Sequence, residues 1–107
     1  MEKNLEITPR EVAELLKTGS IKLLDVRTPE EYAIAAIPGS VLVDQTLVQE
    51  IMQSWPKDAP IVTSCHHGMR SLDAAAYLRG HGFVNARSMS GGIDAWSMQV
   101  DPSIPRY

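Results

Sequence analysis

The chain has 107 residues, of which 44% are hydrophobic and 21% are charged. This length is enough for one domain with its own core, so we expect a single domain over residues 1–107. The one cysteine, Cys65, excludes a disulfide scaffold, and no apolar stretch approaches the about 20 residues that a membrane helix needs. The formal net charge of −3 offers no basic surface for nucleic acid or an anionic membrane.

Residues 5–7 are predicted to form a short edge strand that leads directly into a helix. Thr8 can cap this helix, Pro9 suits its first position, and Glu11 completes a capping box. Apolar side chains at helical spacing continue until Gly19, which ends the helix. The first residues of the chain contain no hydrophobic region of a signal peptide. With a free cysteine, this predicts a reducing compartment, most simply the cytoplasm.

Residues 21–26 are mostly apolar, which is typical of a buried parallel strand. Thr28-Pro29-Glu30-Glu31 repeats the capping pattern and predicts a short helix through about residue 35, which Ile37-Pro38-Gly39 ends. The later elements follow the same alternation of strand and helix. We expect strands at 41–43, 60–64 and 83–88, and helices over 46–55, over 71–81 and after Gly91-Gly92.

This alternation predicts an α/β fold, in which an open parallel sheet is covered by helices on both faces. The sequence contains no internal repeat and no low-complexity segment. Residues 100–107 include two prolines and are expected to run as an extended segment over the surface.

Cys65 occupies the place where such a sheet carries its chemistry, beyond the carboxyl end of a strand. It directly follows the predicted strand 60–64, and a helix is expected to start near Ser71. The free amides and positive dipole end of that helix favour a thiolate, and Arg70 adds positive charge. Gly68 allows the loop to curl with its amides pointing inward. The sequence therefore favours a reactive Cys65 over a small buried residue that closes a strand.

Five short motifs along the chain resemble those of the rhodanese family. They occur in the family's order and cover nearly the whole chain. The motifs are Leu24-Asp25-Val26-Arg27 with Pro29-x-Glu31-Tyr32, Ile37-Pro38-Gly39, Cys65-x-x-Gly68-x-Arg70-Ser71, Gly82-Phe83, and Gly91-Gly92-Ile93-x-Ala95-Trp96.

The resemblance implies a rhodanese-like fold and a sulfurtransferase. Cys65 would take a sulfane sulfur from a donor such as thiosulfate or a persulfide and pass it to a thiophilic acceptor. The partners would be small sulfur-containing anions or protein persulfides, with no metal or organic cofactor, because the Cys65 persulfide is the carrier. The loop residues that would bind the terminal sulfur anion are His66, His67, Gly68, Met69, Arg70 and Ser71.

The length of this loop distinguishes two chemistries within the resemblance. Related phosphatases have seven residues from cysteine to arginine inclusive, whereas Cys65 to Arg70 spans six, the smaller ring that suits sulfur. The chain departs from the family at Ala35-Ala36, where Gly-His usually precedes Ile-Pro-Gly. Any role of that histidine in orienting the neighbouring loop is therefore missing.

Other residues near the predicted site have two interpretations each. His66 and His67 are adjacent, so they cannot easily face one metal ion, and we expect them to flank the mouth of the site. Asp25 either braces the active loop by holding Arg27 or Arg70, or forms an ordinary ion pair at the edge of the sheet. Met69 is expected to line an apolar side of the pocket.

Two further function classes remain open at this stage. A non-catalytic rhodanese-like module would use the same cleft to bind a partner protein. A redox-sensing thiol would be oxidised at Cys65, although the chain holds no second cysteine to resolve it. Retention of the cysteine in an activating environment favours catalysis.

Overall fold

The computed structural model describes residues 4–107 and contains one five-stranded sheet with the strand order β1-β5-β4-β2-β3. All four strand pairs are parallel, as the alternation of elements predicts. The strands are β1 (Glu6–Ile7), β2 (Lys22–Asp25), β3 (Val41–Leu42), β4 (Ile61–Ser64) and β5 (Arg87–Met89). The helices are α1 (Pro9–Lys17), α2 (Pro29–Ile34), α3 (Gln45–Ser54), α4 (Met69–Gly80) and α5 (Gly92–Gln99).

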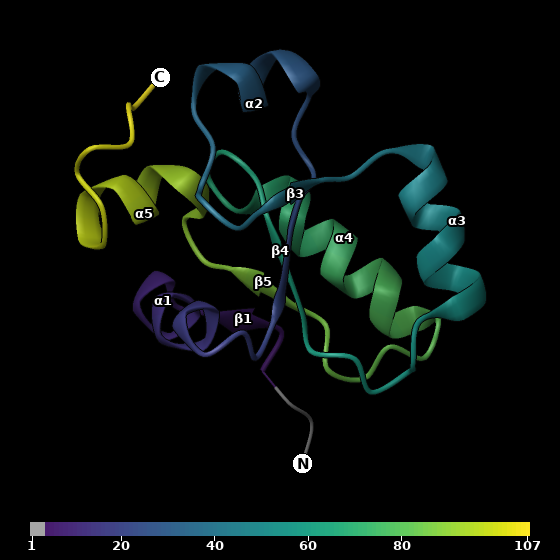
Figure 1. Ribbon diagram of the computed structural model, residues 1–107. Helices are drawn as coiled ribbons and strands as arrows, with labels where there is room; N and C mark the ends of the chain where they lie inside the picture. The colour runs from purple at the N-terminus through teal and green to yellow at the C-terminus, as the bar shows by residue number, and fades with distance from the viewer. Residues whose placement is uncertain (1–3) are drawn as a thin grey trace.

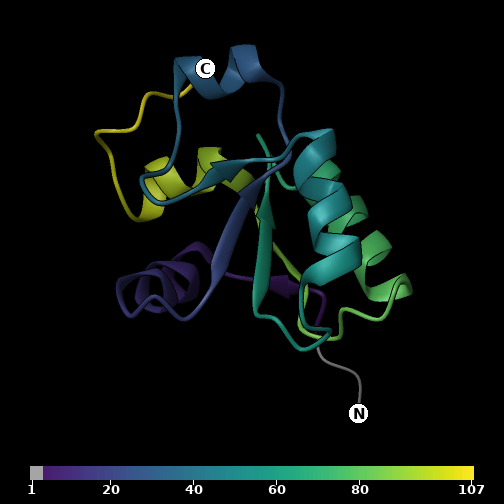
Figure 2. The same cartoon turned by 45° about the vertical axis from the view of Figure 1, so that its right-hand side comes forward.

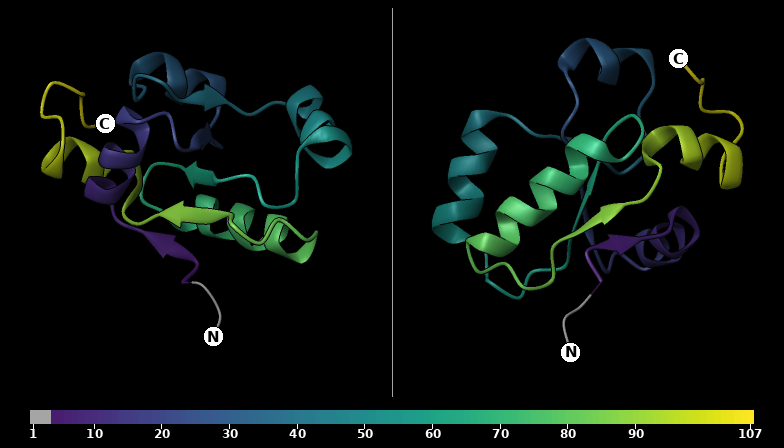
Figure 3. Two further views of the ribbon diagram at one scale, coloured as in Figure 1. Left: turned by 60° about the horizontal axis from the view of Figure 1, so that its bottom comes forward. Right: turned by 180° about the vertical axis from the view of Figure 1, so that it is seen from behind.

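Helices cover both faces of the sheet, so the predicted architecture is confirmed (Figures 1 and 2). Neighbouring residues of a strand enter opposite cores, because side chains alternate across a sheet. Leu23 belongs to the core beneath α1 and α5, whereas Leu24 belongs to the core beneath α3 and α4. The short helix α2 lies apart from these two layers, at the end of the sheet where β2 and β4 finish (Figure 3).

The helix starts follow the local sequence closely. Thr28 accepts a hydrogen bond from the Glu31 amide, and the Glu31 carboxylate accepts one from the Thr28 amide, which completes the predicted capping box. Thr8 caps α1 through the Glu11 amide, but there the Glu11 carboxylate accepts from the Thr8 hydroxyl instead of its amide. Both helices have proline at the first position.

Two predicted boundaries are wrong in a way that affects the site. Helix α4 begins at Met69 instead of Ser71, with Gly68 as its N-cap, so that Arg70 and Ser71 lie in its first turn. The last strand covers Arg87–Met89 instead of 83–88, because Phe83 bonds back to the carbonyl of Leu78 and closes a turn. The Phe83 side chain is nevertheless fully buried.

The segment after α5 leaves the helix without regular structure and returns towards α2, as the views from the front and from behind agree (Figures 1 and 3). The Ser97 hydroxyl donates to the Ile104 carbonyl and holds the bend. The segment therefore wraps over the surface, as predicted. Within residues 4–107, no helix is both long enough and apolar enough to span a membrane.

Candidate functional site

Cys65 lies at the carboxyl end of the central strand β4, directly before the loop that leads into α4. Its Sγ accepts hydrogen bonds from the Gly68 amide at 3.1 Å and from the Ser71 amide at 3.3 Å. The thiol donates to the Ser71 hydroxyl at 3.4 Å, and once the thiol has lost its proton this hydroxyl can turn from the Gly68 carbonyl and donate to the thiolate. The side chain is 1% exposed. Two amides and one hydroxyl thus surround one buried sulfur atom, and all three can donate to its thiolate form.

The shape of the loop depends on a glycine at its turn. Gly68 has a φ of +102°, which L side chains rarely adopt, and this conformation directs its amide at the sulfur. A Cβ at this position would also lie 3.0 Å from the Gly91 amide nitrogen. Gly68 therefore permits both the turn and the close approach of the α5 N-terminus.

Helix α5 fixes the outer side of the same loop. The Ile93 amide donates to the Cys65 carbonyl at 2.8 Å, and the Asp94 amide donates to the His66 carbonyl at 3.1 Å. These two amides lie in the first turn of α5, where amides have no acceptor within the helix, and the loop carbonyls supply one for each. Two helix N-termini therefore meet at the loop: α4 supplies donors to the sulfur, and α5 orients the peptide groups that precede them.

The surrounding donors set the acidity of the thiol. Burial is the largest single influence and raises the pKa of Cys65, because a thiolate is poorly solvated inside the protein. The Ser71 hydroxyl and the amides of Ser71, Gly68 and Arg70 act in the opposite direction and outweigh it. The net result is a pKa of Cys65 below the ordinary thiol value. The geometry thus matches the thiolate predicted from the sequence.

This lowered pKa makes a measurable prediction. Because only the thiolate is alkylated, the rate for Cys65 should rise with pH through a midpoint below the ordinary value of about 8.5. Ser71→Ala removes one donor and should move the midpoint upward, whereas Ser40→Ala, whose hydroxyl donates to the Ile37 carbonyl, should leave it in place. Iodoacetamide rates across pH measure it. A Ser71→Ala midpoint equal to that of the wild type would contradict the assigned cause.

Arg70 holds the active loop against α2. Its guanidinium donates to both oxygens of the Glu31 carboxylate, at 2.7 and 3.0 Å. This pairing lowers the pKa of Glu31 and raises the pKa of Arg70. The positive charge that the sequence places near Cys65 is thus paired with a carboxylate, and Arg70 fixes the loop.

Glu31 was not predicted as part of the site, because its local sequence indicates only a helix cap. In the structure its carboxylate has two roles. It accepts a hydrogen bond from the Thr28 amide as part of the helix cap, and it pairs with Arg70, which is 39 residues away. It also accepts from the Tyr107 hydroxyl at 2.7 Å. No local signal marks these two distant partners.

Asp25 holds Arg27, not Arg70. The Arg27 guanidinium donates to both oxygens of Asp25, with a shortest distance of 2.6 Å, and both side chains are buried. The same guanidinium donates to the Ala35 carbonyl at 2.6 Å, which fixes the segment where the chain has Ala35-Ala36. Burial by itself would lower the pKa of Arg27, but the bonds to Asp25 and Tyr107 raise it overall. This is a buried pair at the carboxyl end of β2, which lies between β4 and β3, not an ordinary pair at the edge of the sheet.

The remaining loop residues differ in their surroundings. Met69 is 78% exposed, so its side chain points to solvent. The prediction that it lines an apolar side of the pocket is therefore wrong. The His66 ring is half-buried between two other rings, with His67 at 3.8 Å and Tyr107 at 3.9 Å between centroids. His67 is largely exposed. The two histidines therefore lie at the outer side of the loop, as expected for the mouth of the site.

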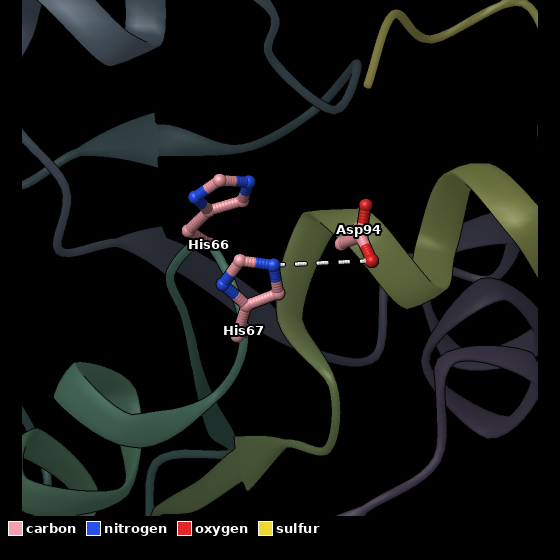
Figure 4. Close-up of side chains that lie close together, drawn as sticks. All are labelled: His66, His67 and Asp94. Carbon is pink, nitrogen blue, oxygen red and sulfur yellow. Dashed lines mark ion pairs between the residues drawn. The ribbon is translucent and has the colours of Figure 1, made fainter. Parts of the chain in front are cut away.

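His66, His67 and Asp94 bring one potential metal ligand each within 4.8 Å of the others (Figure 4). However, the two imidazole rings are stacked with an interplanar angle of 27°, so their lone pairs do not converge on one point. The Asp94 carboxylate is already paired with the Arg106 guanidinium at 2.8 Å, which lowers the pKa of Asp94. As arranged, the three residues do not fit a metal ion.

The family described as "Rhodanese-like domain" matches residues 8–99. A relative named thiosulfate sulfurtransferase GlpE, from Ectopseudomonas mendocina, is 37% identical over 90 residues, which is 84% of this chain and 82% of that protein. A probable adenylyltransferase/sulfurtransferase MoeZ from Mycobacterium tuberculosis is also 37% identical, and there the chain spans only 28% of the relative.

Solved structures agree with the fold. The crystal structure of a rhodanese-like domain protein from Staphylococcus aureus has a TM-score of 0.73 at 28% identity, with 100% of this chain and 99% of that chain covered. The human single-domain sulfurtransferase TSTD1 has a TM-score of 0.79 at 24% identity, with 91% and 98% covered. Both carry the same α/β arrangement over nearly their whole length. The chain therefore belongs to the rhodanese-like domain family.

Proposed function

We propose that this protein is a thiosulfate sulfurtransferase-type enzyme that carries sulfur as a persulfide on Cys65. The observation that supports the proposal most directly is the ring of donors around Sγ, formed by the amides of Gly68 and Ser71 and the Ser71 hydroxyl. Such a cradle stabilises an anion on sulfur, as an oxyanion hole does on oxygen. The proposal takes residues 1–107 as one domain and a reducing compartment, such as the cytoplasm, as its location.

The reaction proceeds in two balanced steps. The Cys65 thiolate attacks the outer sulfur of thiosulfate, the sulfur–sulfur bond of the donor breaks, and sulfite leaves with the bonding electron pair. The product is a Cys65 persulfide anion within the loop. A thiophilic acceptor then attacks the outer sulfur, the persulfide bond breaks, and the thiolate is restored. No net oxidant or reductant is needed beyond the donor and the acceptor.

Several features support sulfur over phosphate as the transferred group. The loop from Cys65 to Arg70 has six residues and closes tightly enough for three donors to reach one sulfur atom. Arg70 is engaged with Glu31, which leaves the backbone as the main anion binder. The name of the GlpE relatives supports thiosulfate as the first donor to test.

Intact-protein mass spectrometry after incubation with thiosulfate tests the proposal. The wild type is expected to gain one sulfur atom, and cyanide is expected to remove it as thiocyanate. Cys65→Ala is expected to gain none, and because Cys65 is the only cysteine, no second thiol can obscure the result.

Ser40→Ala serves as a matched control, since among residues 4–107 the Ser40 hydroxyl donates only to the Ile37 carbonyl and the Tyr32 hydroxyl. It should gain sulfur as the wild type does. Absence of sulfur gain from thiosulfate and from a low-molecular-weight persulfide would refute the proposal and favour the non-catalytic binding module. A gain that persists in Cys65→Ala would refute the assignment of the carrier residue.

A further inference from the structure

The segment 101–107, here called the closing segment, lies against the site from outside. Its first residues are anchored on α5 and the core: the Asp101 amide donates to the Trp96 carbonyl at 3.0 Å, and the Ile104 side chain packs against the core that contains Trp96. The Ser97 hydroxyl donates to the Ile104 carbonyl at 2.9 Å, and Arg106 forms a two-point ion pair with Asp94 at the start of α5. The Arg106 side chain of this pair is largely exposed, so solvent screens the interaction. The closing segment is therefore fixed firmly at residues 101–104 and more weakly at the exposed Arg106 pair.

Tyr107 makes the closest approach of the closing segment to the active loop. Its ring stacks on the His66 ring with centroids 3.9 Å apart and planes 9° from parallel. His66 is the residue that follows Cys65, and His67 stacks on the other face of the His66 ring. The three rings form a continuous stack at the outer side of the loop that follows Cys65.

The Tyr107 hydroxyl links three separate parts of the site. It accepts a hydrogen bond from Arg27 Nη1 at 2.8 Å and donates to Glu31 Oε2 at 2.7 Å. The same Glu31 carboxylate holds Arg70 of the active loop. Tyr107 therefore joins the buried Arg27, the helix α2 and the loop that carries Cys65.

We propose that Tyr107 is a specificity-determining residue, which closes one side of the access to Cys65 and so selects small sulfur donors over bulky ones. The identification of the substrates as sulfur donors rests on the proposed function, whereas the control of access to Cys65 does not. The Cys65 side chain is 1% exposed, whereas Tyr107 is 38% exposed and can swing outward when its bonds open. Because the sulfur is buried, any donor needs an opening to reach it, and a thiol carried by a large molecule needs the wider opening that displacement of Tyr107 provides.

Alkylation of Cys65 with two reagents of different size tests this gate without any sulfur transfer. N-ethylmaleimide and a maleimide on a short polyethylene glycol chain share one reacting group. Both rates depend in the same way on the thiolate fraction of Cys65, so their ratio reports only how easily each reagent reaches the sulfur. Tyr107→Ala removes the ring and the hydroxyl, whereas Tyr107→Phe retains the stack on His66 and loses only the two hydroxyl bonds.

Tyr77→Ala is a matched control. Tyr77 is a 55% exposed tyrosine whose ring also contacts a histidine ring, that of His81, in a tilted arrangement at the end of α4 opposite to the loop. Its loss should leave the rate ratio within about twofold, the size of a minor surface effect. Urea denaturation of each variant shows that the fold is retained.

For Tyr107→Ala, the rate of the bulky reagent relative to the small one should rise about tenfold, which corresponds to about 1.4 kcal/mol in the opening equilibrium. Tyr107→Phe should give a smaller rise in the same direction. A ratio unchanged in both variants would overturn the gate, even if thiosulfate loads Cys65. A raised ratio supports the gate even if no sulfur is gained, so that failure of the two proposals can be told apart.

Discussion

Replacement of Asp25 by alanine is expected to lower the free energy of unfolding by about 3–5 kcal/mol, because it leaves Arg27 as a buried charge without its carboxylate. Asp25 is 1% exposed and accepts three hydrogen bonds from the Arg27 side chain and one from its amide. Total stabilities are commonly about 5–15 kcal/mol, so the loss is a large share of the whole. Urea denaturation of both proteins measures the difference.

The double variant Asp25→Leu/Arg27→Met distinguishes the cost of leaving one buried charge unpaired from the loss of the ion pair itself. Removal of both charges leaves neither uncompensated, so the double variant should recover most of the loss. Glu14→Ala is the control for an exposed pair: Glu14 bonds to Lys17 on the surface of α1, and its loss should change stability by less than about 1 kcal/mol. An Asp25→Ala loss as small as that of Glu14→Ala would show that the buried pair does not stabilise the sheet.

The position of Cys65 could be predicted because every signal for it is local. Ile61–Ser64 is apolar and β-branched, the cysteine follows directly, and Gly68 marks a turn before a helix. Strand, loop and helix are neighbours in the chain, so one window of sequence contains the whole arrangement. The same locality explains why both threonine caps were predicted correctly.

The residues that sequence reasoning missed act across long separations. Glu31 meets Arg70 across 39 residues and Tyr107 across 76. Each has a sufficient local explanation, a cap in one case and an extended segment in the other, so nothing in the sequence requires a second role. Only the fold brings α2, the active loop and the closing segment together.

The misplaced start of α4 has a related cause. Ser71 is a residue type that often caps helices, so the sequence places the helix start there. In the structure its hydroxyl instead contacts the Cys65 sulfur, the Gly68 carbonyl and the Ser88 hydroxyl, all within the buried site. The chain gives up a side-chain cap at Gly68 and gains a donor to the sulfur. A local preference is thus overridden exactly where the chemistry is proposed.

Gly92→Ala is expected to damage both stability and the site, because α5 docks on the active loop through this glycine. Gly92 has a φ of +61°, and a Cβ there would lie 2.5 Å from the His66 carbonyl oxygen and even nearer to that of Cys65. The left-handed backbone costs about 1–2 kcal/mol and the overlap about 1–3 kcal/mol more, so we expect a loss of about 2–5 kcal/mol. Urea denaturation measures the loss.

Gly19→Ala and Gly80→Ala separate the two contributions. Gly19 has a similar φ of +67° but nothing within 4 Å of its Cβ position, so its substitution should cost only the backbone strain, about 1–2 kcal/mol. Gly80 lies in α4 with open space and no positive φ, so alanine there should be neutral or stabilise the protein by up to about 1 kcal/mol. The excess loss in Gly92→Ala over Gly19→Ala isolates the contact with the loop.

Gly92→Ala also links the contact between α5 and the active loop to the chemistry of Cys65. When the α5 amides can no longer hold the Cys65 and His66 carbonyls, the peptide groups of the loop rotate and the donors at Gly68 and Ser71 move off the sulfur. The alkylation midpoint of Cys65 should then shift upward, towards the ordinary thiol value, and sulfur loading from thiosulfate should slow at least about tenfold. A Gly92→Ala protein that loses stability yet keeps the wild-type midpoint would show that α4 alone shapes the cradle and that α5 only supports the fold.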